Sequence, residues 1–173
     1  VSPNIGDMVG RQLGRLTPEL ALVVDTLSQC EPLGLDVLCD LVGRHDLEVA
    51  ERMHLVTVGR SAGALSVRLA HPLFGEIRRA NAGEMYLSSI RGRLAQRLAE
   101  DDDPDMQATV RRGLLTLESD LDPNPALYLE SARFAMTLLD LQLAERFASA
   151  AAKSGVAEAA SVQVMNMVLL GRG

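Results

Sequence analysis

The spacing of hydrophobic residues follows a helical period along nearly all of this chain and departs from it once. On both sides of the central segment, apolar residues recur every three or four positions, as on one face of an amphipathic helix. Residues 55–58 and 65–69 are instead short β-type runs with a period of two, separated by a loop that contains two glycines. The sequence therefore predicts a mainly α fold that is interrupted by one two-stranded hairpin.

The chain before this hairpin contains clear helix start and stop signals. Thr17 offers a side-chain oxygen for an N-cap, Pro18 suits the first helical turn, and Gly43 suits a C-cap. These signals and the spacing predict helices over residues 4–16, 18–28, 35–42 and 46–53. Three to four short helices followed by a two-stranded wing is the element order of a winged-helix domain, and the wing needs those helices because an isolated hairpin is unstable.

The chain after the hairpin is predicted to be helical throughout. The pattern indicates helices over residues 72–80, 84–100, 105–117, 125–138, 141–153 and 157–170. Short loops make neighbouring helices antiparallel, and the small residues at 148–152 can pack closely against Ala132 and Ala135. We therefore expect TPR-like helical hairpins, although a strict tetratricopeptide pattern is absent because the chain has no Trp.

An acidic segment suggests where the chain divides into domains. Residues 100–105 contain five acidic residues and one proline, which favours a solvated linker. We expect a winged-helix domain with trailing helices over residues 1–100. A truncated TPR-like repeat region over residues 101–173 is expected to follow it.

The composition is typical of a globular protein. The chain has 173 residues, of which 47% are hydrophobic and 23% charged, and its net charge is -6. No apolar run approaches the ~18 residues that a membrane-spanning helix needs, and the N-terminus does not have the order of a secretory signal. We therefore expect a cytoplasmic protein with no membrane partner, cut from a longer chain.

Motifs for catalysis are missing from the sequence. There is no G-x-x-x-x-G-K-[ST] phosphate loop, no serine lies in a nucleophile-elbow context, and two cysteines with three scattered histidines do not form a metal-ligand pattern. We expect no enzyme activity, no metal and no cofactor in this chain by itself.

Direct DNA binding requires a basic face, which the first half of the chain does not offer. Residues 1–70 contain six arginines and nine acidic residues, and the candidate recognition helix over residues 46–53 has three acids against Arg52 alone. Arg60 and Arg68 in the hairpin give small support to a DNA-binding interpretation. A winged-helix DNA-binding regulator with a helical dimerisation tail therefore stays open as an alternative.

Three segments carry a resemblance to a known family. They are Thr17–Leu35, Val67–Glu76 with the phrase R-L-A-H-P-L, and Arg93–Glu100. These segments resemble the middle of large bacterial LuxR-type regulators of the MalT-like class, which are STAND ATPases. The resemblance covers essentially the whole chain, from a winged helix into the first helical repeats.

The resemblance implies a regulatory function. Such proteins join a nucleotide-binding module, a winged helix, a helical-repeat sensor and often a C-terminal DNA-binding domain. We predict that this chain relays the binding of an inducer or protein partner at the repeats to a nucleotide-controlled switch. ADP or ATP would bind to the chain's own nucleotide-binding module, and DNA to a C-terminal domain, both outside these residues. A protein-protein interaction scaffold that uses no nucleotide is a further alternative.

His71 is the residue for which the resemblance implies the clearest role. A histidine at the start of the helix after the wing is expected to contact the β-phosphate of ADP and hold the closed state. An imidazole can donate a hydrogen bond to phosphate, and the helix dipole adds positive potential at that position. The alternative is that His71 packs against its neighbours or caps the helix before Pro72.

Five arginines follow His71 within a short stretch. They are Arg78, Arg79, Arg91, Arg93 and Arg97, against only two acids, Glu76 and Glu84. This local excess predicts an interaction face toward an acidic partner, the nucleotide-binding module or the phosphate site. The alternative is an ordinary solvated face.

Overall fold

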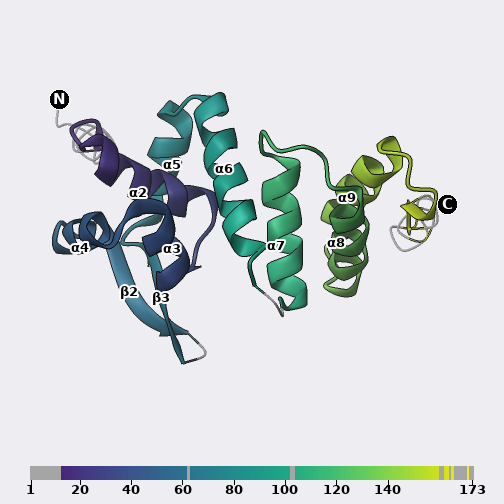
Figure 1. The fold of residues 1–173 in the computed structure, drawn as a ribbon, viewed down its shortest axis with the longest axis horizontal. Coiled ribbons are helices and arrows are strands. Elements are labelled where there is room, and N and C mark those ends of the chain that lie inside the picture. Colours follow the sequence, from purple (N-terminus) through teal and green to yellow (C-terminus); the bar gives the residue numbers. More distant parts are fainter. Residues whose placement is uncertain are drawn as a thin grey trace. The chain divides into compact units, whose positions relative to one another are not determined.

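The computed structural model describes residues 13–61, 63–101, 104–159, 162–163, 165 and 171. Within these residues the chain is mainly helical, with eight α-helices and a three-stranded antiparallel sheet (Figure 1). It forms two compact units, residues 1–90 and 91–173. The mainly helical fold class predicted from the hydrophobic spacing is thereby confirmed.

The domain boundary predicted between residues 100 and 101 stays a prediction. The two compact units divide inside helix α6 (Glu84–Leu98), before the acidic segment. The reason lies in what the second half of α6 contacts. Arg91 donates a hydrogen bond to the Glu118 carbonyl at 2.6 Å, and Gly92 lies against Asp120 and Leu121. The last turns of α6 therefore belong to the second unit, and each unit is described separately below.

Unit 1 is organised around one helix, α2 (Pro18–Gln29). Thr17 caps it as predicted, with its side-chain oxygen accepting from the Leu20 N–H at 3.4 Å. Val23, Val24 and Leu27 on its apolar face are fully buried. The other helices wholly within the unit are α3 (Leu35–Val42), α4 (Arg44–Arg52) and α5 (Pro72–Asn81), and α2 packs against all three.

Helices α3 and α4 are joined by Gly43 alone. Gly43 has a φ of +87°, a conformation that strongly favours glycine, and its N–H bonds to the Cys39 carbonyl as a C-cap does. Because the chain turns at this one residue, α4 begins at Arg44 and not at Asp46 as predicted.

The sheet of unit 1 has three strands where the sequence predicted two. Strand β2 (Val56–Ser61) pairs with β3 (Ala64–Leu69), and β1 (Leu33–Gly34) pairs with the other edge of β3, giving the order β1-β3-β2. Two residues are too few to show a period, which is why the sequence did not reveal β1. Beyond β1, the Glu31 carboxylate accepts from the Leu69 N–H at 2.8 Å and so extends the contact along β3.

The β2–β3 hairpin is longer than the sequence predicted. Its pairing continues outward to Ser61 opposite Ala64, so that much of the predicted loop belongs to the strands. In Figure 1 the hairpin extends away from the helices of unit 1. The base of the hairpin is held by Val56, Val67 and Leu69, which are buried, whereas Gly59 and Arg60 farther out are exposed.

Unit 2 contains three consecutive helices, α7 (Met106–Leu117), α8 (Pro125–Thr137) and α9 (Leu141–Lys153), close to the predicted ranges. Each begins at a polar side chain that accepts a backbone N–H three residues later. The caps are Asp105 at 2.7 Å, Asn124 at 3.0 Å and Asp140 at 3.0 Å. Such caps satisfy donors that a helix leaves unpaired, and they fix where each helix starts.

The core of unit 2 is built largely from small residues around one aromatic ring. Phe147 is fully buried, and around it lie fully buried alanines of α8 and α9, namely Ala132, Ala135, Ala144, Ala148 and Ala151. The alanines predicted to allow close helix contact thus share one core. On α7, Gly113 leaves space that the Ser131 hydroxyl of α8 occupies.

The predicted terminal helices over residues 4–16 and 157–170 lie mostly outside the described residues. Among the helices that are described, none combines the length and the apolar character needed to cross a membrane.

Gly113→Ala should lower the free energy of unfolding by about 2 kcal/mol, since overpacking a tight helix contact outweighs the better helix propensity of alanine. The new Cβ would meet the Ser131 hydroxyl and lie 2.9 Å from the Ser131 Cβ and 3.2 Å from Phe147 Cε1. Urea denaturation monitored by circular dichroism measures this change.

Gly92→Ala is the matched control for this prediction. Its nearest neighbour would be a carboxylate oxygen of exposed Asp120, which can rotate away. Its stability should stay equal or rise by up to about 1 kcal/mol. Equal losses in the two variants would contradict the tight α7–α8 contact.

Candidate functional site

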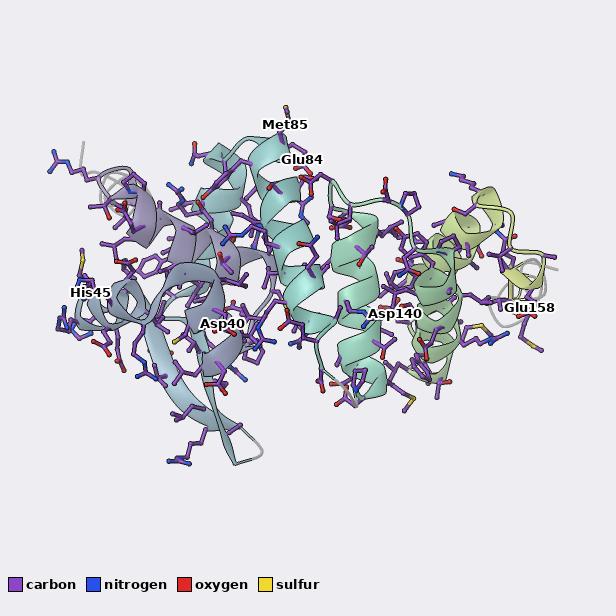
Figure 2. All side chains as sticks on the ribbon, viewed as in Figure 1. Asp40, His45, Glu84, Met85, Asp140 and Glu158 are labelled. Atoms are coloured by element: carbon purple, nitrogen blue, oxygen red, sulfur yellow. The ribbon has the colours of Figure 1, made fainter. Side chains whose placement is uncertain are left out.

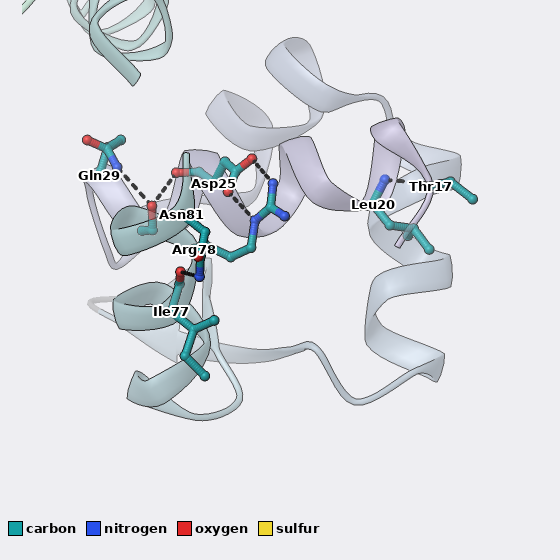
Figure 3. A network of polar contacts seen from close by, with 8 residues as sticks. Thr17, Leu20, Asp25, Gln29, Ile77, Arg78 and Asn81 are labelled. Carbon is teal, nitrogen blue, oxygen red and sulfur yellow. Dashed lines mark hydrogen bonds and ion pairs between the residues drawn. The ribbon is translucent and has the colours of Figure 1, made fainter. Parts of the chain in front are cut away.

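A buried ion pair joins α2 to α5 in unit 1. The Asp25 side chain is completely buried, and it accepts from Arg78 Nε at 2.7 Å and from Arg78 Nη2 at 2.6 Å (Figure 3). The Arg78 side chain is itself 20% exposed. This two-bond geometry is the one in which guanidinium and carboxylate interact most strongly.

The pair continues into a small polar network at the end of α2. The Ser28 hydroxyl donates to the Asp25 carbonyl at 2.7 Å and accepts from Gln29 Nε2 at 2.8 Å. Arg79 donates to the Ser28 carbonyl, one of the last carbonyls of α2. The hydrogen bond to Asp25 raises the pKa of Arg78 above its usual value, although burial acts in the opposite direction. Arg78 therefore stays charged inside this network.

His71 lies at the N-cap of α5, and Ala70 alone separates it from the end of strand β3. Its Nδ1 accepts from the Leu73 N–H at 3.1 Å, and its ring centroid is 6.0 Å from that of Phe74. Because Nδ1 acts as the acceptor, the neutral ring carries its proton on Nε2. The residue is exposed. The His71 side chain thus caps α5 through Nδ1. In the neutral ring, Nε2–H is then the group that can donate a hydrogen bond.

The five arginines of the predicted interaction face differ in what they contact. Arg78 and Arg79 bind α2 within unit 1, as described above. In unit 2, Arg91 donates to the Glu118 carbonyl, and Arg97 lies 3.2 Å from the Glu100 carboxylate. Arg93 also takes part in a polar or electrostatic interaction and is therefore not free. An interaction face made by all five stays a prediction, but Arg78 and Arg79 already hold the fold of unit 1.

The surface of α3 and α4 is dominated by carboxylates. Four acidic side chains are exposed there, Asp36, Asp40, Glu48 and Glu51, against two exposed arginines, Arg44 and Arg52. Asp40 and His45 mark this surface in Figure 2. An excess of negative charge repels a phosphate backbone, so the combined surface of α3 and α4 is poorly suited to bind DNA.

Cys39 lines a pocket of about 190 Å³ in unit 1, together with Arg44 and Glu51. Burial raises the pKa of the Cys39 thiol, and the nearby Arg44 only partly opposes this effect. A thiol with a raised pKa is protonated at neutral pH, whereas the thiolate is the nucleophile. Cys39 is therefore a poor catalytic nucleophile.

Iodoacetamide should test this assignment. The alkylation rate of Cys39 should rise with pH along a curve whose midpoint lies above the ~8.5 of a free cysteine, because only the thiolate reacts. The measurement is mass spectrometry of the Cys39 peptide over a pH series, with glutathione in the same tube as the reference thiol. A midpoint below that of the reference would contradict the effect of burial.

Unit 2 contains a larger open groove of about 630 Å³ between the end of α7, the start of α8 and one face of α9. We call it the α7–α9 groove and define it by Leu117, Leu121, Tyr128, Arg146, Ala150 and Lys153. Sequence reasoning did not single it out, because its residues come from three separate elements. The one sequence feature that could have drawn attention to the groove is Lys153, because it is the only lysine of the chain.

Among the described residues, no group of three or more histidine, cysteine and carboxylate side chains is arranged so that it could hold a metal ion. No family model, curated protein or solved structure matches this chain.

The burial of Asp25 was also not predicted from the sequence, although among the described residues of unit 1 it is the charged residue with the lowest exposure. The available signal was an acid directly after two valines, in a helix whose other buried residues are apolar or hydroxyl-bearing. It could not reveal the partner, because Arg78 lies on a different helix, far along the chain, and resembles the other arginines of its segment.

Arg78→Met should destabilise the chain by about 3 kcal/mol, because it leaves the Asp25 carboxylate buried without a partner. The double variant Asp25→Leu, Arg78→Met should recover much of this loss, since apolar residues of similar size remove both buried charges. Urea denaturation of the single and double variants measures the coupling.

Arg44→Met is the matched control for this experiment. Arg44 pairs with Glu48 at 3.9 Å, and both side chains are more than half exposed. Such surface pairs contribute about 0–1 kcal/mol. If Arg78→Met cost no more than Arg44→Met, the buried pair would not hold α5 on α2.

Proposed function

We propose that this chain is a regulatory relay segment of a LuxR-type STAND transcriptional regulator, as its sequence resemblance implies. It couples the binding of a signal or partner at helical repeats to a nucleotide-controlled switch. The observation that carries the proposal is the place of His71, which begins α5 directly after the hairpin and has Nε2–H as its ring donor.

The element order of unit 1 supports the winged-helix part of this proposal. Helix α2, strand β1, helices α3 and α4 and the β2–β3 hairpin follow one another in the order expected for that fold, and the sheet joins β1 to the hairpin through β3. In this interpretation α4 is the recognition helix and the β2–β3 hairpin is the wing. The acidic surface of α3 and α4 favours a role in protein contacts over DNA contacts.

His71 has the chemistry that a phosphate contact needs. The cap uses Nδ1, so Nε2–H can donate to a phosphate oxygen without loss of the capping bond. The N-terminus of α5 adds partial positive charge, and anions bind well at such ends. A phosphate that binds only the closed state would then bias the switch toward that state. The phosphate belongs to ADP or ATP held by the protein's own nucleotide-binding module.

The helices of unit 2 supply the sensor side of the relay. Helices α8 and α9 form an antiparallel pair with a core of small residues, as expected for TPR-like hairpins. An inducer or protein partner would bind at these repeats, and DNA would bind to a separate C-terminal domain. This proposed role places the protein in the cytoplasm.

The DNA-binding alternative predicts a measurable affinity that the relay does not. We expect no binding of this chain to random duplex DNA at 50 mM salt, because the exposed charge of α3 and α4 is mostly negative. Fluorescence anisotropy between about 50 and 200 mM salt measures it. Micromolar binding with a steep salt dependence would instead make α4 and the hairpin a DNA-binding surface.

Substitutions at His71 separate its capping role from a phosphate contact. Aspartate is a good N-cap, so His71→Asp should keep the stability of the chain within about 0.5 kcal/mol, whereas His71→Ala should cost about 1 kcal/mol. In the full-length regulator, His71→Asp should weaken ADP binding about tenfold or more, because a carboxylate would face the phosphate.

The measurement for this pair of variants is urea denaturation of the chain and ADP titration of the full-length protein. His71→Asn serves as the neutral cap control. Unchanged ADP affinity in His71→Asp, together with the stability loss in His71→Ala, would leave His71 as a cap only and would remove the main support for the relay.

A further inference from the structure

The α7–α9 groove follows one face of α9. Arg146, Ala150 and Lys153 lie on successive turns of that helix and all line the groove. With a rise of 1.5 Å per residue, the stretch from Arg146 to Lys153 spans about 10 Å. The volume of about 630 Å³ lies in the range of sites that bind small molecules. Its length suits a compact ligand better than a long peptide.

Part of the groove lining is apolar. Leu117 and Leu121 come from the end of α7 and the loop after it, Tyr128 from α8 and Ala150 from α9. Tyr128 is almost completely buried and stacks on Phe147 of the core with ring centroids 6.5 Å apart. Through Tyr128, the apolar part of the lining is therefore continuous with the core of unit 2.

Three charged residues line the groove, Glu145, Arg146 and Lys153, and all three belong to α9. Arg146 is paired with the Glu118 carboxylate at 2.5 Å, and the Ser149 hydroxyl donates to Glu145 at 3.4 Å. Lys153 is exposed. Asp120 and Asp122 lie in the neighbouring loop but do not line the groove. Of the three charged residues in the lining, Lys153 is the one whose side chain has no hydrogen-bond or ion-pair partner among the described residues.

We propose that the α7–α9 groove binds a small organic anion with an apolar body about as long as the groove, whose negatively charged end pairs with Lys153. A medium-chain or aryl carboxylate fits this description. The apolar body would lie on Leu117, Leu121 and Ala150, while the carboxylate accepts from the ammonium group. This inference goes beyond the proposed relay, because binding at the groove can be tested in unit 2 whatever the role of His71.

The single lysine makes the test specific. N-hydroxysuccinimidyl acetate acylates amines, so within this chain the only side chain that it acylates at this rate is Lys153, and the α-amino group serves as an internal reference. Octanoate should slow acylation of Lys153 at least fivefold relative to the α-amino group, as followed by mass spectrometry. Octan-1-ol, which has the apolar body alone, and butyrate, which has the charge with a short body, should protect it less than twofold.

Direct binding of octanoate to variants provides the second measurement. Isothermal titration should show at least a fivefold weaker affinity for Lys153→Gln and an affinity within twofold of the original for Lys153→Arg. Arg133→Gln is the matched control, since Arg133 is a surface cation of the same unit that pairs with Glu158 and does not line the groove. Circular dichroism establishes that each variant is folded.

The outcomes are distinct. Saturable octanoate binding that weakens in Lys153→Gln and persists in Arg133→Gln supports the proposal. Equal protection by octanol or butyrate, unchanged affinity in Lys153→Gln, or protection by an acidic apolar peptide but not by octanoate would each overturn it. None of these results depends on ADP, so failure here is distinguishable from failure of the relay.

Discussion

The buried contact between Asp25 and Arg78 is the interaction on which the arrangement of unit 1 most depends. Helix α2 lies at the centre of the unit, and α5 is attached to it through this pair and through the contact of Arg79 with the end of α2. A buried carboxylate is costly unless it is fully paired, so α5 has only a narrow choice of positions on α2. The pair thereby also fixes the N-terminus of α5, where His71 lies, relative to the hairpin that precedes it.

Much of the fold could be predicted because local signals determine it. Thr17, Gly43 and the helix spacing gave the positions of α2 and α3, and the periods of α7 to α9 gave their ranges nearly to the residue. The elements that were missed depend on contacts between distant residues. Strand β1 forms because Leu33 and Gly34 pair with Val67 and Ser66. A stretch of two residues is too short for a sequence pattern to predict this pairing.

The candidate site was less predictable than the fold for the same reason. The position of His71 at the start of a helix follows from Pro72, but its capping bond and the resulting assignment of Nε2 as the donor required coordinates. The arginines near it looked alike in the sequence, and only the structure separates Arg78, which completes a buried pair, from Arg97, which forms a partly exposed pair with Glu100. The number of charged residues in a segment predicts the sign of its electrostatic potential. The partner that each charged side chain contacts depends on the tertiary structure.

Having Lys153 as its only lysine gives this chain an unusual practical property. Chemistry directed at side-chain amines, such as coupling to a sensor surface, would fix the molecules through the same end of the α7–α9 groove and would cover that end. A protease specific for lysine would cut the chain at one peptide bond, directly after α9. The described residues show three side-chain hydrogen bonds that would still join the released segment to unit 2, namely Arg133 with Glu158, Gln163 with Ser149, and the Ser154 hydroxyl with the Ala150 carbonyl. Lys153 is thus the one side chain through which amine chemistry can attach this protein to a surface or block the groove, and at which a lysine-specific protease can cut the chain.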